Sequence, residues 1–174
     1  MSDMNAAGEA TTVYRYVDWL ITVPLQIVEF YLILAAVTAV TSGLFWRLLG
    51  ASLVMLVFGF LGEAGLMNAT VGFAIGMAAW IYIIYEVFSG EASKLAASSG
   101  NKGGQFAFNT LRLILTAGWA IYPIGYFLGY LGGGTEDHIN TVNIIYNVAD
   151  LVNKTAFGLA IWAGAKMDSS ENSD

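Results

Sequence analysis

The chain has 174 residues, of which 57% are hydrophobic and 11% are charged, and it contains no cysteine. Its mean hydropathy of +0.64 is typical of a protein embedded in a lipid bilayer and not of a soluble domain. The formal net charge of −6 argues against nucleic acid as a partner.

Five apolar stretches of about 20 residues or more follow one another, each long enough to cross the hydrocarbon core as a helix. They span residues 14–40, 46–66, 70–88, 106–131 and 139–165. The short strands of alternating polarity that a transmembrane barrel needs are not seen. The sequence therefore predicts one all-α transmembrane domain over residues 1–174. The loop 89–105 should be mobile, and the polar tail 168–174 should be disordered.

Basic residues predict how these spans are oriented. With five alternating spans, one side of the membrane receives five basic residues: Arg47, Lys94, Lys102, Arg112 and Lys166. The positive-inside rule makes that side cytoplasmic. We therefore expect the N-terminus outside and the C-terminal tail inside the cell.

A polar stripe crosses the first stretch. Its members recur at spacings of three or four residues, which places them on one face of a helix: Arg15, Asp18, Thr22, Gln26 and Glu29. Asp18 and Glu29 differ by only about 20° around the axis and lie about three turns apart. One such acid alone could serve as a structural hydrogen-bonding group. Two acids and an arginine on one face, each costly to bury, indicate stations on a proton path.

The fourth stretch carries the aromatic residues Trp119, Tyr122 and Tyr126 around Pro123. Taken alone, this pattern favours ordinary aromatic packing around a proline kink. Beside a chemically modified lysine, the same side chains would wall a slot for a flat, conjugated ligand.

Lys154 is the most unusual residue of the last stretch. It lies near the middle, with Asp150 one helical turn before it. A lysine at this depth is a functional-site hypothesis by default, and its amine can form a Schiff base with an aldehyde. A lysine that reaches the interface is the alternative, which Lys166 fits better. The polar faces of the first and last stretches should both turn inward, which would place Asp18 and Asp150 near one cation.

Four segments resemble the helices of the proteorhodopsin family, which are microbial rhodopsins that pump protons with light. They are RYVDWLITVPLQIVEFYLIL (15–34), FGFLGEAG (58–65), GWAIYPIGYFLGY (118–130) and IYNVADLVNKTAFGLAIW (145–162). The resemblance covers nearly the whole chain, from about residue 12 to residue 167. It matches only the third to the seventh of the family's seven helices, so the first two helices are expected to be absent from this chain.

The resemblance implies a light-driven outward proton pump of the bacterial inner membrane, and not an enzyme. Lys154 would bind all-trans-retinal as a Schiff base. Asp18 would be the proton acceptor and counterion, and Asp150 the second counterion. Glu29 would be the cytoplasmic proton donor. The supporting residues would be Arg15 and Thr22.

The resemblance also implies a retinal pocket and a colour. The pocket would be lined by Trp19, Gln26, Trp119, Tyr122, Pro123 and Tyr146, and no metal is expected. Blue-absorbing members of the family have Gln at the position of Gln26, and green-absorbing members have Leu. The pigment is therefore predicted to absorb blue light.

Several alternatives stay open at this point. A photosensory rhodopsin would share the lysine and the counterions but usually lacks a carboxylate at the position of Glu29. A helix-bundle scaffold without photochemistry is the alternative from a different class. We expect the chain to be a partial sequence of a longer protein, although a genuine truncated chain would need partner helices. The expected partners are lipid, retinal and protons, and a homo-oligomer is left open.

Overall fold

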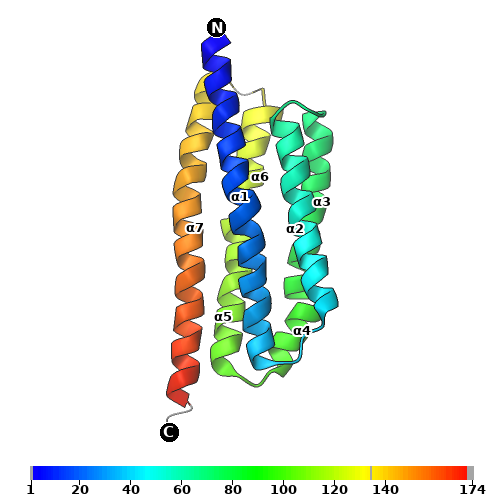
Figure 1. Ribbon diagram of the computed structural model, residues 1–174, viewed down its shortest axis with the longest axis vertical. Helices are drawn as coiled ribbons and strands as arrows, with labels where there is room; N and C mark the ends of the chain where they lie inside the picture. Colours follow the sequence, from blue (N-terminus) through cyan, green and yellow to red (C-terminus); the bar gives the residue numbers. More distant parts are fainter. Residues whose placement is uncertain (1, 134, 172–174) are drawn as a thin grey trace.

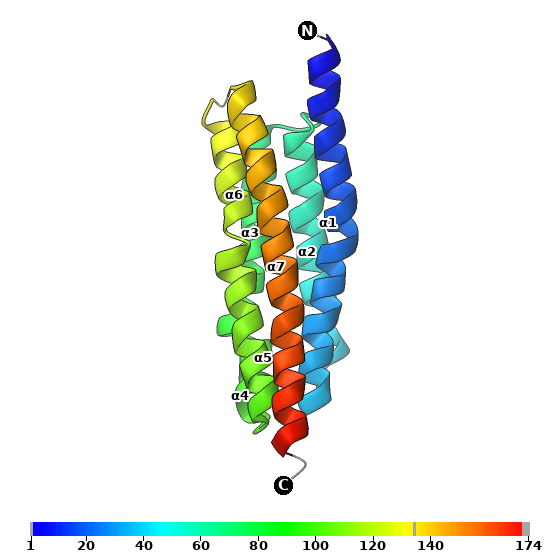
Figure 2. The ribbon, with the colours of Figure 1, turned by 90° about the vertical axis from the view of Figure 1, so that its left-hand side faces the viewer.

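The computed structural model describes residues 2–133 and 135–171, which form long helices packed side by side (Figure 1). The elements before the first π-helical segment are α1 (Ser2–Val37), α2 (Ser42–Glu63), α3 (Ala69–Phe88), α4 (Glu91–Ser98) and α5 (Lys102–Leu113). The elements that follow are η1 (Ile114–Gly118), α6 (Ile121–Tyr126), η2 (Phe127–Leu131) and α7 (Glu136–Glu171). The two ends of the chain lie at opposite ends of the bundle in both views (Figures 1 and 2). The predicted all-α fold is confirmed.

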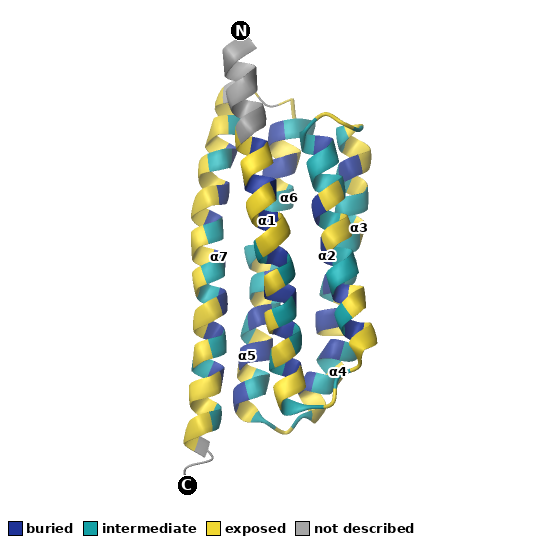
Figure 3. Cartoon of the chain, viewed as in Figure 1, coloured by how far each residue is buried: buried dark blue, intermediate teal, exposed yellow. Residues whose placement is uncertain are grey.

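Among the described residues, four helical segments are long and apolar enough to cross a membrane. They are Thr11–Val37, Ser42–Glu63, Ala69–Ser98 and Lys102–Leu131. The fifth predicted span falls on α7, which has 36 residues but a more polar composition. Buried residues line the inner faces of the helices, whereas α7 exposes much of its surface (Figure 3).

Side-chain caps determine where three of the helices begin. Thr41 Oγ1, Asn68 Oδ1 and Asn101 Oδ1 each accept a hydrogen bond from a backbone amide in the first turn of α2, α3 and α5. These contacts satisfy amides that have no partner within the helix. Gly65, with φ of +70°, lies in the tight turn between α2 and α3, where an L side chain would be strained.

Two segments are more ordered than the composition predicts. The expected loop 89–105 contains α4 and the start of α5, and the Glu91 carboxylate binds both Arg47 at 2.5 Å and Thr41 at 2.8 Å. The expected disordered tail is helical as far as Glu171, while residues 172–174 lie outside the described part. Asn101 Nδ2 donates to Asp168 Oδ1 at 2.5 Å, which holds the end of α7 against the start of α5.

The helix around Pro123 departs from regular α-geometry. The Trp119 amide donates to Ile114 O and the Tyr122 amide donates to Trp119 O, each one residue away from the regular register, so the carbonyls of Leu115 and Gly118 lose their usual donors. Side chains of neighbouring helices replace those donors. Trp80 Nε1 donates to Leu115 O, and Asn153 Nδ2 donates to Gly118 O, both at 3.0 Å. Because freed carbonyls in lipid need an internal partner, these bonds join the irregular segment to α3 and α7.

Candidate functional site

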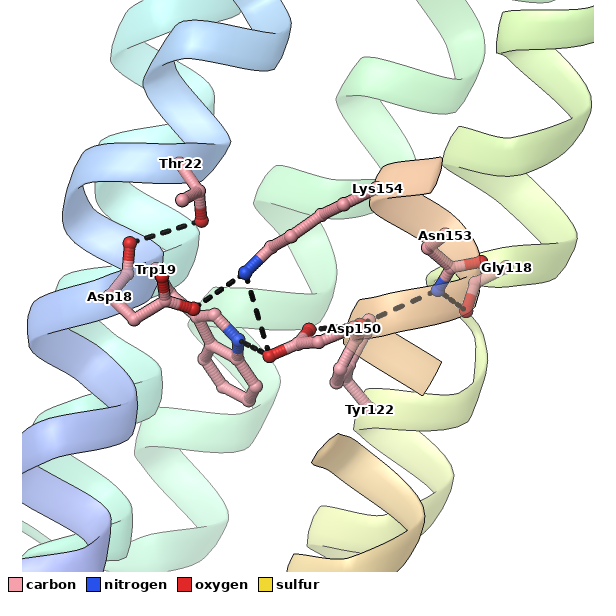
Figure 4. A network of polar contacts seen from close by, with 8 residues as sticks. All are labelled: Asp18, Trp19, Thr22, Gly118, Tyr122, Asp150, Asn153 and Lys154. Carbon is pink, nitrogen blue, oxygen red and sulfur yellow. Dashed lines mark hydrogen bonds and ion pairs between the residues drawn. The ribbon is translucent and has the colours of Figure 1, made fainter. Parts of the chain in front are cut away.

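Lys154 extends from α7 toward α1 and meets two carboxylates (Figure 4). Its Nζ lies 2.5 Å from Asp18 Oδ2 and 3.7 Å from Asp150 Oδ2. The side chains of Lys154, Asp18 and Asp150 are 31%, 47% and 16% exposed, respectively. The structure thus brings together the lysine and both carboxylates that the sequence singled out, from helices that begin and end the chain.

Neutral hydrogen-bond donors hold Asp150 at both oxygens. Trp19 Nε1 donates to Oδ2 at 2.8 Å, and the Tyr122 hydroxyl donates to Oδ1 at 2.5 Å. Asn153 Nδ2 lies 3.4 Å from the Tyr122 hydroxyl and extends this network (Figure 4). A carboxylate in a low-dielectric site needs such donors to remain ionised without a large desolvation cost.

Asp18 is held differently. Within the described residues, only Lys154 hydrogen-bonds to its carboxylate. Thr22 Oγ1 donates to the backbone carbonyl of Asp18 at 3.0 Å and not to the side chain. Of the two acids beside Lys154, Asp150 therefore accepts hydrogen bonds from neutral donors, whereas Asp18 accepts none from the neutral side chains described.

A partly open cavity adjoins the lysine. Its walls come from α1, α2, α3, the irregular helix around Pro123, and α7, and they are mainly apolar and aromatic. Five of the predicted pocket residues line it: Trp19, Gln26, Trp119, Tyr122 and Pro123. The lining suits a flat apolar ligand, and the amine of Lys154, which also lines the cavity, can form a Schiff base with a ligand that carries an aldehyde, with loss of water.

Tyr146, the sixth predicted pocket residue, is not among the residues that line this cavity. It is 1% exposed, and its hydroxyl donates to the backbone carbonyl of Tyr122 at 2.7 Å. Its ring packs against Trp19 and Tyr122, with centroids 5.6 and 5.4 Å apart. Tyr146 thus packs against Trp19 and Tyr122, which line the cavity, without lining it itself.

The polar stripe of α1 does not turn inward as a whole. Gln26 is 7% exposed and lines the cavity, and its Nε2 has no hydrogen-bond partner among the described residues. Glu29 is exposed and does not line the cavity. Asp18, only about 20° from Glu29 around the helix, is exposed as well, whereas Gln26, about 60° from Glu29, faces the core. Within the described residues, the stripe is thus buried at Arg15 and Gln26 and exposed at Asp18 and Glu29.

Glu63 is a buried partner that the sequence analysis did not single out. Its carboxylate forms an ion pair with Arg15, and the two side chains are 2% and 5% exposed. Arg15 also donates to Asn143 Oδ1, and the Tyr16 hydroxyl donates to Glu63 Oε1 at 3.1 Å. A lone carboxylate in the apolar stretch 46–66 was the available signal. No cluster of metal-ligating side chains occurs in the part of the chain described.

Comparison with known proteins places these features in a family. The family model described as "Bacteriorhodopsin-like protein" matches residues 1–167. The blue-light absorbing proteorhodopsin of Gamma-proteobacterium Hot 75m4 is 54% identical, over 94% of this chain and 64% of that protein. The green-light absorbing proteorhodopsin of Gamma-proteobacterium EBAC31A08 is 55% identical, over 94% of this chain and 65% of that protein.

A solved structure of a proteorhodopsin is also similar to this chain. The crystal structure of blue light-absorbing proteorhodopsin from Med12 superposes with a TM-score of 0.75 at 57% identity, over 94% of this chain and 71% of that one. The chain spans somewhat less than two thirds of the two curated relatives, 64% and 65% of their lengths. The resemblance to proteorhodopsins is confirmed, and this chain belongs to the bacteriorhodopsin-like protein family.

Proposed function

We propose that this chain forms the chromophore-binding and proton-transferring part of a light-driven outward proton pump. The observation that carries the proposal is the Lys154 amine, 2.5 Å from Asp18 and 3.7 Å from Asp150, beside an aromatic cavity. The names of two relatives, which describe blue-light and green-light absorbing proteorhodopsins, support light absorption as the activity.

Lys154 would hold all-trans-retinal covalently, as a Schiff base, with its chain in the cavity. The fit rests on the apolar, aromatic walls and on small residues where the ligand needs room, among them Gly59 and Gly76. The unpartnered Nε2 of Gln26 offers one polar contact to the ligand. When bound, retinal would supply visible absorption and a light-driven change of shape at the lysine nitrogen.

Asp18 and Asp150 would have different roles in moving the proton. Asp18 Oδ2 lies within hydrogen-bond distance of Lys154 Nζ, so it would receive the proton from that nitrogen. Asp150 would keep its charge, because Trp19 and Tyr122 already donate to both of its oxygens. The proton would then leave toward the N-terminal end of α1.

Arg15 and Glu63 lie on that exit side. Arg15 precedes Asp18 by three residues, about 4.5 Å along the helix axis. Its ion pair with Glu63, with the Tyr16 hydroxyl beside it, would form the next polar group on the way out.

Glu29 would resupply the proton from the opposite side of Lys154. It follows Asp18 by 11 residues, about 16 Å along the axis of α1. It does not line the cavity, so water in this half of the protein would carry the proton to the lysine nitrogen. A photosensory protein would not need this donor.

The orientation would follow from the basic residues. We place the N-terminus outside and the C-terminus in the cytoplasm of a bacterial cell, with α7 as a fifth span across the inner membrane. The end of the bundle that holds the C-terminus also holds the α4–α5 connection and the start of α2, where Arg47, Lys94 and Lys102 lie (Figure 1).

The test is to add all-trans-retinal to membranes that contain the chain. We expect a visible absorption band in the native chain and in Lys166→Ala, whose lysine lies over the Trp162 ring at 5.2 Å, away from the cavity. Lys154→Ala should have no band. Illuminated vesicles should show outward proton movement, whereas a band without such movement would favour a light sensor. A band retained in Lys154→Ala would overturn the assignment.

A further inference from the structure

Asn153 is a buried polar residue to which the proposed proton transfers assign no role. It directly precedes Lys154, is 7% exposed and lines the cavity. Its Nδ2 donates to Gly118 O at 3.0 Å and lies 3.4 Å from the Tyr122 hydroxyl oxygen. It therefore connects the irregular helix around Pro123 to the network that holds Asp150.

The backbone of Gly118 determines which way the Asn153 amide faces. A carbonyl oxygen can only accept, so the group that faces Gly118 O must be the NH₂ of the amide. A Cβ at Gly118 would lie 2.3 Å from Asn153 Oδ1, so a side chain there would displace the amide. The carbonyl is available because the irregular turn before Pro123 removes its regular donor.

The orientation of Asn153 in turn determines the direction of the next hydrogen bond. An amide NH₂ has no acceptor lone pair, so the Tyr122 hydroxyl cannot donate to it. The single hydroxyl hydrogen of Tyr122 is left to point at Asp150 Oδ1, 2.5 Å away. We propose that Asn153 is a positioning residue that keeps the Tyr122 hydroxyl directed at Asp150 and so holds this counterion beside Lys154.

The effect of Asn153 on the absorption maximum rests on the proposed function, because it needs bound retinal. A counterion held close to the lysine nitrogen stabilises positive charge localised there. Loosening Asp150 would weaken that stabilisation and move the absorption band to longer wavelength. The hydrogen-bond direction itself belongs to the protein alone and can be measured without retinal.

The experiment compares two variants that remove the contact with two matched controls. Asn153→Leu keeps the volume but loses the donor, and Gly118→Ala displaces the amide without changing any polar group. The controls are Asn147→Leu, at an exposed position of α7, and Gly158→Ala, where a Cβ would meet nothing within 4 Å. The readouts are the ring-carbon NMR signal of Tyr122 in protein labelled with 13C-tyrosine, without retinal, and the absorption maximum with retinal.

We expect both test variants to move the Tyr122 signal and to shift the band to longer wavelength, and both controls to change neither. Tyr122→Phe identifies the signal. An unchanged signal and an unchanged maximum in Asn153→Leu would refute the positioning role and leave the pump proposal intact. If the native chain forms no visible band, the pump proposal fails and the Tyr122 signal still decides the role of Asn153. If Gly118→Ala does not fold, as judged by circular dichroism, Asn153→Leu decides alone.

Discussion

Substitutions of Arg15 and Glu63, which form a buried ion pair, should change the free energy of unfolding by amounts that are not additive. The side chains are 5% and 2% exposed, so both charges are buried. Glu63→Leu removes the anion and leaves the guanidinium with neutral partners. These partners include Asn143 and the rings of Tyr146 and Trp19, whose centroids lie 4.8 and 5.3 Å from the guanidinium carbon.

The size of the effect follows from this burial. Breaking a buried ion pair from one side destabilises by about 3–5 kcal/mol, because the remaining charge has lost its partner. The ring contacts persist in Glu63→Leu, so we expect a loss near the lower end, about 3 kcal/mol. Arg15→Met should lose a similar amount by leaving Glu63 unpaired. The double variant removes both desolvation costs and should lose only about 1 kcal/mol or less.

The assay is unfolding of the four proteins in mixed micelles by added sodium dodecyl sulfate, followed by circular dichroism. Glu91→Gln is the control, because it breaks only the ion pair between Arg47 and Glu91, whose side chains are 43% and 31% exposed, and leaves Arg47 paired with Glu86. An exposed pair of this kind contributes at most about 1 kcal/mol. A double variant that loses the sum of the two single losses, about 6 kcal/mol, would refute the reasoning based on desolvation.

Three further predictions concern proton transfer, colour and packing. In the retinal-loaded protein, Asp18→Asn should block outward pumping. In flash photolysis, Glu29→Gln should make reprotonation of the lysine nitrogen slow and dependent on bulk pH. Unchanged reprotonation in Glu29→Gln would contradict the role of Glu29 as proton donor. Gln26→Leu should move the absorption maximum to longer wavelength, because the cavity loses a polar amide beside the ligand, and an unmoved maximum would rule this out. Gly72→Ala should lose about 1–3 kcal/mol in the same unfolding assay, since its Cβ would lie 2.7 Å from a carbonyl oxygen of α2. Gly50→Ala, whose Cβ would meet nothing within 4 Å, should lose nothing.

The sequence by itself determined the helices and the order of polar groups along each of them. Asp150 and Lys154 had to lie one turn apart on one face, because helical geometry depends only on local spacing. Apolar length likewise predicted four of the spans that the structure contains. The resemblance to proteorhodopsins also came from the sequence, because it rests on short motifs around Asp18, Asp150 and Lys154.

Only the tertiary structure decided which side chains meet across helices. Glu63 pairs with Arg15, and Asn153 binds Gly118, through contacts between residues 48 and 35 positions apart in the chain. Asp18 and Glu29 are exposed, whereas Gln26 of the same stripe lines the cavity. These outcomes depend on how each helix is rotated about its axis and on the irregular turn before Pro123. Packing of the whole bundle sets both, and spacing within one helix carries no information about either.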